Sequence, residues 1–307
     1  MPTPPQDGPK AADGPPREER KSLAAAYAVC EQLAREHYEN FPVASVLLPK
    51  RMRPAIAAIY AFARRADDFA DEPGYDDAER LRLLDDWSRR LHGCVDQSPR
   101  AGAADPAFLA LGDTIRTYRL PLSLFDDLLS AFRQDVTVKR YRSWPDVLDY
   151  CRRSANPVGR LVLRVAGYHD EGLDRASDAV CTALQLTNFW QDLARDWANG
   201  RLYVPLDDRD GAGALDGDLD AGRLTPAWQD ALRTVSARTR DLFAAGRPVC
   251  DGVGGRLKLE LRATWLGGVR ILDRLEQAEF DVFRRRPRLA AGDALPILWR
   301  AATWKAA

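Results

Sequence analysis

The segment from Ala183 to Pro205 constrains the fold most, because it carries a ladder of polar side chains inside an otherwise apolar helical pattern. The ladder consists of Gln185, Asn188, Asp192 and Asp196, which are spaced three, four and four residues apart. On a helix of about 3.6 residues per turn, these side chains stack on one face. Amide and carboxylate oxygens suit a hard divalent cation, but the same face would also fit a helix that simply faces solvent.

A second acidic face lies upstream, on the helix expected from Met52 to Asp71. Its residues are spaced four, three and four apart, with one further acid beside them: Tyr60, Arg64, Asp67, Asp71 and Asp68. Acids at positions i and i+4 repel each other by about 0.3 kcal/mol on an isolated helix. A divalent cation between them would turn this repulsion into attraction. Asp pairs are common elsewhere in the chain, so chance is the competing explanation for either motif alone. Together, the two helices predict a site that holds a diphosphate through Mg²⁺, which prefers carboxylate and phosphate oxygens.

The composition excludes several classes of function. The 45 basic and 45 acidic residues balance, so binding to nucleic acid through bulk charge is not expected. Five scattered cysteines without a C-x-x-C pair indicate a reducing compartment and argue against a disulfide framework or a zinc site. Three dispersed histidines are too few for a His-ligated metal centre. With no apolar run of about 18 residues and no signal-peptide core, we expect a cytoplasmic protein.

The periodicity of apolar residues predicts an all-α chain. Residues 1–21 are rich in Pro, Gly and charge, and we expect them to form a disordered tail. Residues 22–307 are expected to form a single domain of about ten helices, because no segment alternates with period two. Among them are helices expected over residues 178–197 and 257–283, and residues 201–205 should run on from the first of these in extended form. The Asn156-Pro157 step should interrupt a helix, since proline disfavours helical geometry at the residue before it. The Asp/Gly-rich stretch 205–224 is expected to be a surface loop.

The two motifs also carry a resemblance to a known family. DDFAD at 67–71, preceded by YAFARRA, together with ALQLTNFWQDLARDWANGRLYVP, resembles the squalene/phytoene synthases, which join prenyl diphosphates head to head. The resemblance spans nearly the whole chain after the tail. Details such as NFPVAS, SANPVGR and NFWQD are most similar to the HpnC-type bacterial synthases of hopanoid biosynthesis. The resemblance implies the class I isoprenoid synthase fold, a helical bundle around a central cavity.

The resemblance also implies roles for individual positions. It places the metal ligands, which would hold three Mg²⁺ ions with the substrate diphosphate, at Asp67, Asp68, Asp71, Asn188, Asp192 and Asp196. The implied catalytic residues are Asp67, Asp71, Asn188, Asp192, Asp196, Tyr60 and Tyr150. The implied substrate-binding residues are Phe41, Arg64, Gln185, Arg201, Tyr203 and Arg285. Metal ions and arginines would neutralise the leaving diphosphate, and each aromatic face would stabilise the resulting carbocation by about 1–2 kcal/mol.

Three departures from the family pattern refine the expected reaction. Residues 38–41 read Tyr-Glu-Asn-Phe where many members have Ser-x-Ser-Phe, Gln191 replaces an arginine, and Gly268 replaces a tyrosine. Each change weakens one phosphate or pocket contact. We therefore expect a substrate with one diphosphate, presqualene diphosphate, which would ionise, rearrange and capture water to give hydroxysqualene. Because water capture consumes no hydride, no NADPH is expected.

Other functions remain open at this point. The main alternative is the head-to-head condensation of two prenyl diphosphates. A terpene cyclase fits less well, because its second motif carries a hydroxyl residue at the position of Asp192 and lacks the GRLYVP extension. A non-catalytic helical interaction protein would carry the acids by chance and bind no magnesium. A product as apolar as a C30 alcohol predicts transient contact with the inner membrane or with other hopanoid-pathway enzymes, although no strongly basic amphipathic helix is evident.

Overall fold

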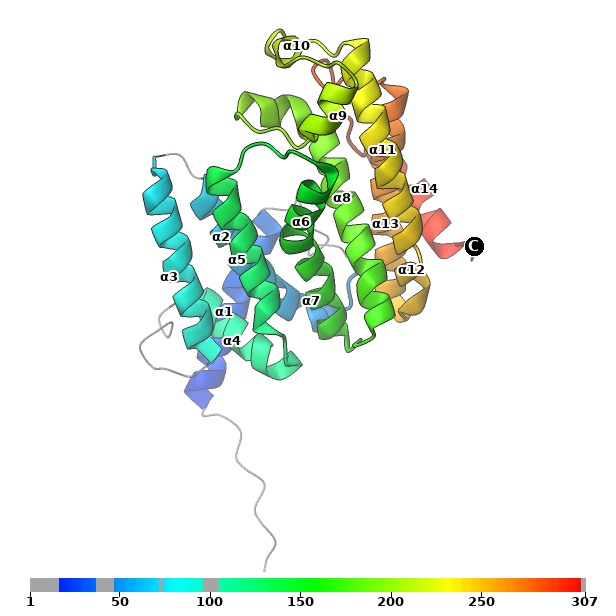
Figure 1. Ribbon diagram of the computed structural model, residues 1–307. Coiled ribbons are helices and arrows are strands. Elements are labelled where there is room, and N and C mark those ends of the chain that lie inside the picture. The colour runs from blue at the N-terminus through cyan, green and yellow to red at the C-terminus, as the bar shows by residue number, and fades with distance from the viewer. Residues whose placement is uncertain (1–16, 37–46, 72–73, 96–104, 305–307) are drawn as a thin grey trace, which may run out of the picture.

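The computed structural model of the chain describes residues 17–36, 47–71, 74–95 and 105–304. Within these ranges the chain is all-α, and the only extended pairing is an isolated bridge between Arg140 and Leu202 (Figure 1). The predicted fold class is confirmed. A short 3₁₀ helix, Lys50–Met52, precedes α2. The α-helices are α1 Arg17–Glu36, α2 Arg53–Asp71, α3 Asp77–Val95, α4 Pro106–Tyr118, α5 Leu122–Thr137, α6 Trp144–Ser154, α7 Asn156–Ala166, α8 Glu171–Ala198, α9 Leu206–Gly211, α10 Asp216–Asp220, α11 Pro226–Gly246, α12 Val249–Gly252, α13 Gly255–Gln277 and α14 Ala291–Ala302.

Local sequence signals explain several helix boundaries. Asp170 caps α8 by accepting a hydrogen bond from the backbone N–H of Leu173, so this helix begins at Glu171, earlier than the expected start near residue 178. The predicted interruption at Asn156-Pro157 is confirmed, because α6 ends at Ser154 and α7 begins at Asn156.

Three boundaries differ from the sequence-based expectation. The first helix begins at Arg17, five residues before the start expected at Ser22, while residues 1–16 of the predicted tail lie outside the described part of the chain. The stretch 205–224 is not only loop, because it contains the short helices α9 and α10. Helix α13 ends at Gln277 instead of running to residue 283. Glu279 and Phe280 both adopt positive φ, and a right-handed helix cannot continue through such residues.

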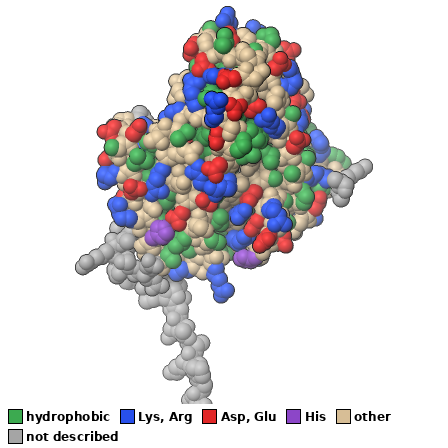
Figure 2. All heavy atoms as spheres, in the orientation of Figure 1, with side chains coloured by type: hydrophobic (Ala, Val, Ile, Leu, Met, Phe, Trp, Pro, Cys, Tyr) green, Lys and Arg blue, Asp and Glu red, His purple; other side chains and the backbone are tan. Residues whose placement is uncertain are grey.

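The long helix α8 runs through the middle of the bundle and packs against α6, α7, α11 and α13 (Figure 1). Helix α2 packs in the other half, against α1, α3, α4 and α5. Each half has its own group of fully buried side chains, including Phe62, Phe108 and Phe125 around α2, and Trp190 and Trp228 around α8. Burying one such side chain contributes about 1.5–3 kcal/mol, so both helices are held firmly in place. On the face shown in Figure 2, acidic and basic side chains are interspersed, in keeping with the zero net charge.

Two tryptophans tie these central helices to their neighbours. The indole N–H of Trp190 on α8 donates to the Thr239 hydroxyl on α11 at 3.0 Å, and that of Trp87 on α3 donates to the Phe62 carbonyl on α2 at 3.2 Å. Both rings are buried, so these hydrogen bonds satisfy the one polar atom that each ring carries.

The chain leaves α8 in the extended form that the sequence predicts. The backbone N–H of Leu202 donates to the Lys139 carbonyl at 2.9 Å, and that of Leu206 donates to the Tyr141 carbonyl at 3.0 Å. This pairing fixes residues 201–205 beside the segment that follows α5. It therefore sets the positions of Arg201 and Tyr203.

Candidate active site

The C-terminal ends of α2 and α8 meet at Arg201. Its guanidinium forms a two-pronged ion pair with Asp71, the last residue of α2, with one N–O distance of 3.2 Å. The backbone N–H of Arg201 donates to the carbonyl of Asp196 on α8 at 2.8 Å. Arg201 therefore connects the two acidic helices that the sequence analysis singled out.

Two further arginines pair with acids of the same group. Arg64 lies 2.8 Å from Asp68 and 3.4 Å from Asp67, all within α2. Arg286, which follows α13, makes a two-pronged ion pair with Asp192 on α8, with one distance of 3.0 Å. We refer to Asp67, Asp68, Asp71, Asp192 and Asp196 as the acid cluster. Among the described residues, no three Asp, Glu, His or Cys side chains are grouped closely enough to hold a metal ion as they stand, and arginines are instead the partners of these acids.

The electrostatics of the acid cluster fit a divalent cation. Burial and, second to it, the nearby charge of Asp71 together raise the pKa of Asp67 to about 6. Burial and the charge of Asp192 likewise raise the pKa of Asp196 to about 7. In both cases the protein disfavours the charged carboxylate, mainly by removing water and secondarily by placing acids together. A hard cation with oxygen preference would relieve both effects, so the donor set suits Mg²⁺.

An aromatic group borders the acid cluster. The rings of Phe189 and Tyr203 stack in parallel with centroids 3.6 Å apart, and the ring of Tyr141 also stacks with Tyr203, with centroids 5.7 Å apart. Tyr150 lies 6.0 Å from Tyr203, and its hydroxyl donates to Asp135 at 2.8 Å. Two of the predicted site residues, Tyr150 and Tyr203, therefore stand together beside the acids.

Asp135 is a site residue that the sequence analysis missed. It is buried near the end of α5, and burial raises its pKa to about 7 although Tyr150 donates a hydrogen bond to it. A signal was present in the sequence. Leu124, Leu128, Ala131 and Asp135 follow helical spacing, which puts an acid on the buried face of an amphipathic helix. A carboxylate in such a position needs a partner or a function.

The remaining predicted residues lie in varied surroundings. Tyr60 is buried on α2, where burial raises its pKa. On α8, Gln185 is half-buried and Asn188 is exposed on the face that carries the acids. Arg285 is exposed, and the neighbouring Arg286 contacts the acid cluster instead. Phe41 lies outside the described residues, as do the other residues of the 38–41 departure.

The structure alters the interpretation of one departure and explains another. Gln191 is buried and its amide donates to the Pro287 carbonyl, so it ties α8 to the segment after α13. Other family members have an arginine at position 191. In this chain Arg286, from the segment after α13, places a guanidinium beside Asp192. The replacement by Gln191 therefore does not by itself indicate a weaker phosphate contact. At Gly268, an added Cβ would lie 2.6 Å from both Leu184 and the Phe243 ring. The surrounding packing leaves no room for a tyrosine there.

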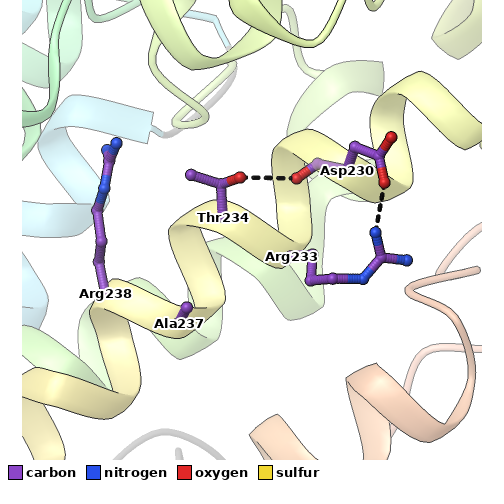
Figure 3. A pocket seen from close by; sticks show the side chains of 5 residues that line it. All are labelled: Asp230, Arg233, Thr234, Ala237 and Arg238. Atoms are coloured by element: carbon purple, nitrogen blue, oxygen red, sulfur yellow. Dashed lines mark hydrogen bonds and ion pairs between the residues drawn. The ribbon is translucent and has the colours of Figure 1, made fainter.

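Two surface hollows lie away from the acid cluster. The first, of about 590 Å³, is lined by five residues of α11, where Thr234 donates to the Asp230 carbonyl and Arg233 pairs with the Asp230 carboxylate (Figure 3). The second, of about 370 Å³, lies between the N-terminal ends of α2 and α13 and the end of α7. Neither is lined by a residue of the acid cluster, so the central cavity implied by the resemblance stays a prediction.

Comparison with known proteins adds independent evidence. A family model described as squalene/phytoene synthase matches residues 34–293. A hydroxysqualene synthase of Zymomonas mobilis is 41% identical over 210 residues, covering 67% of this chain and 67% of that protein. A hydroxysqualene synthase of Rhodopseudomonas palustris is 40% identical over 225 residues, covering 73% and 74%. The crystal structure of squalene synthase HpnC from Alicyclobacillus acidocaldarius aligns with a TM-score of 0.78 at 39% identity, covering 85% of this chain and 98% of that one.

Proposed function

The chain belongs to the squalene/phytoene synthase family, and from this premise we propose that it converts presqualene diphosphate to hydroxysqualene. Membership makes the chain an enzyme, so a non-catalytic interaction protein and a terpene cyclase are both set aside. In the proposed reaction, the C–O bond to the diphosphate breaks and the cyclopropylcarbinyl cation rearranges. Water then forms the new C–O bond and loses one proton. The relatives named hydroxysqualene synthase support this choice of substrate, and no NADPH is needed because no hydride is transferred.

The observation that carries the proposal is the convergence of two acidic helices on Arg201. We propose that Mg²⁺ ions are held by the acid cluster together with Asn188, in line with the raised pKa values of Asp67 and Asp196. When bound, Mg²⁺ would neutralise charge on the leaving diphosphate.

The arginines of the site are suited to hold the diphosphate. Arg64, Arg201 and Arg286 each contact an acid of the cluster, and a planar guanidinium can bind phosphate oxygens through two hydrogen bonds at once. We propose that these side chains turn from their carboxylate partners to the diphosphate when substrate and metal enter. The exchange replaces one set of ion pairs with another, so it leaves no charge unpaired.

The aromatic group is suited to the cation that remains. Tyr203, Phe189, Tyr150 and Tyr141 present ring surfaces beside the acids, and aromatic faces attract a nearby cation. The hydrogen bond from Tyr150 to Asp135 fixes the ring of Tyr150 in place. We propose that these rings shield the cation and limit which water molecule reaches it.

One observation favours the condensation of two prenyl diphosphates as a second candidate. Three guanidinium groups lie at one acid cluster, enough to contact two diphosphates as well as one. Members of the family named phytoene synthase, such as the Zea mays enzyme that is 31% identical over 270 residues, are also similar to this chain.

Product analysis by gas chromatography–mass spectrometry separates the two candidates. Purified protein with Mg²⁺ and without NADPH receives presqualene diphosphate in one reaction and farnesyl diphosphate in another. We expect hydroxysqualene from the first and no new product from the second. Presqualene diphosphate formed from farnesyl diphosphate would establish the condensation instead. A matched reaction with EDTA tests the requirement for the metal.

A further inference from the structure

Helix α14 lies at the edge of the molecule (Figure 1), and three of its large apolar side chains are exposed. Leu295, Leu298 and Trp299 are 78%, 43% and 71% exposed, respectively. Their spacing of three and one residues puts them on one side of the helix, opposite the buried Asp293 and Ala301. Single exposed apolar residues are common on proteins, but three large ones grouped on a short helix mark a surface for interaction.

The bundle holds this face outward by fixing both ends of α14. At the N-terminal end, the Asp293 carboxylate accepts from the backbone N–H of Ala290 at 2.6 Å and pairs with Arg274 at 2.7 Å. At the C-terminal end, Trp304 packs edge to face on Trp265 and lies under the guanidinium of Arg247, 4.6 Å from the ring centre. The helix cannot rotate to bury its outer face without breaking these contacts.

Basic side chains surround the apolar face. Between residues 284 and 304 the chain has five arginines and a single acid, Asp293, which is buried and paired with the bundle. Arg284 pairs with Asp281 and Arg286 with Asp192, so the exposed basic charge on this surface comes mainly from Arg285, Arg288 and Arg300. Arg288, Leu289 and Arg300 are exposed next to the apolar residues. A short helix with Leu and Trp on one side and Arg around it has the composition of segments that lie in the interface of an anionic membrane.

We propose that the protein docks on the surface of an anionic phospholipid bilayer through α14 and residues 284–289. Twelve residues of helix span only about 18 Å, less than the apolar thickness of a bilayer, so α14 would lie along the surface. No described helix is long and apolar enough to cross a membrane. The sequence shows no strongly basic amphipathic helix, because the arginines at 284–288 precede α14 instead of lying within it.

The docking surface is continuous with the active site. Between the exposed Arg284 and Leu289, Arg286 contacts Asp192 and the Pro287 carbonyl accepts from Gln191. A bilayer bound at this segment would bring apolar substrate and product close to the acid cluster. This role in delivering substrate and releasing product rests on the proposed function, whereas binding of the protein to the bilayer does not depend on it.

Vesicle sedimentation tests the proposal with the full chain and without substrate. One set of vesicles contains phosphatidylcholine alone, and the other contains equal parts of phosphatidylcholine and phosphatidylglycerol. We expect the protein to sediment with the anionic vesicles and to be released by salt. The double variant Leu295→Glu/Trp299→Glu should bind at least tenfold more weakly. The matched control is Leu215→Glu, which adds a negative charge at another exposed leucine, 68% exposed, and should bind like the wild type.

Other outcomes overturn the proposal. Failure of the wild type to sediment with either vesicle, or equal losses in the double variant and the Leu215→Glu control, would refute it. A wild-type dimer that the double variant converts to a monomer, without vesicle binding, would assign the face to a second copy of the chain. Circular dichroism checks the fold, and Leu295→Ser/Trp299→Ser replaces the glutamate pair if that variant does not fold. Turnover of presqualene diphosphate dispersed in detergent should be unchanged in the double variant, so failure of docking and failure of the proposed function remain distinguishable.

Discussion

Replacing Arg201 with glutamine tests the electrostatic design of the site most directly. Arg201→Gln removes the guanidinium that pairs with Asp71 and that lowers the pKa values of Asp196 and Asp135. Breaking a fully buried ion pair by removing one partner costs about 3–5 kcal/mol, whereas an exposed pair is worth about 0–1 kcal/mol. The side chain of Arg201 is 18% exposed and that of Asp71 is 46% exposed, so this pair lies between the two limits. We therefore expect a loss of about 2 kcal/mol at pH 8 in the absence of metal.

The loss should depend on pH in a definite direction. The pKa values of Asp196 and Asp135 are raised to about 7 from an ordinary value of 3.8, so the folded state binds their protons more readily than the unfolded chain does. Their charged forms oppose folding, and this opposition is absent below about pH 4 and complete above about pH 7. Removing Arg201 adds to this unfavourable free energy only at pH values at which Asp196 and Asp135 are charged in the folded state. At pH 5.5, where Asp135 and Asp196 are largely protonated in the folded state, the pair with Asp71 is the main interaction lost, and we expect a smaller loss of about 1 kcal/mol.

Thermal unfolding of the metal-free protein at pH 5.5 and pH 8 measures the effect. A loss of about 2 kcal/mol corresponds to a fall in Tm of about 3 °C for a chain of 307 residues. Adding Mg²⁺ with pyrophosphate at pH 8 should recover part of the fall. The control is Arg142→Gln, which breaks the exposed pair with Asp207 and should change Tm little at either pH. An equal fall for Arg201→Gln at both pH values would show that Arg201 acts through Asp71 or packing and not through Asp135 and Asp196, and would refute the reasoning.

Three further predictions concern individual positions. Asp192→Asn and Asp67→Asn should each lower turnover at least about 1,000-fold, because each removes a proposed metal ligand. The far-ultraviolet circular dichroism of both variants should be unchanged. Near-normal rates would refute the assignment of these residues as metal ligands. Asp135→Asn should raise Tm more at pH 8 than at pH 5.5, because it removes a buried carboxylate whose cost to folding grows between about pH 4 and about pH 7. Equal shifts at both pH values would contradict this. Gly268→Ala should cost about 1–3 kcal/mol in urea unfolding, because its Cβ would meet Leu184 and Phe243 at 2.6 Å. Gly211→Ala is the control, because nothing lies within 4 Å of its Cβ, and matching losses would show that crowding is not the cause.

The sequence alone determined the helical class and the two acidic faces. Both follow from spacing along one chain segment, because residues three or four apart on a helix share a face whatever the rest of the protein does. The family resemblance rests on the same local strings, and the break at Asn156-Pro157 follows from the geometry of a single proline.

The tertiary structure decided which residues from different segments meet. That Arg201 joins the ends of α2 and α8, and that Arg286 instead of Arg285 reaches Asp192, depend on how separate helices pack. The same holds for Gln191, whose side-chain amide donates a hydrogen bond to the Pro287 carbonyl. The end of α13 depends on the positive φ of Glu279 and Phe280, which the sequence does not predict because neither residue is a glycine. The outward face of α14 also depends on packing, since the periodicity of a helix shows that one side is apolar but not whether the bundle covers it.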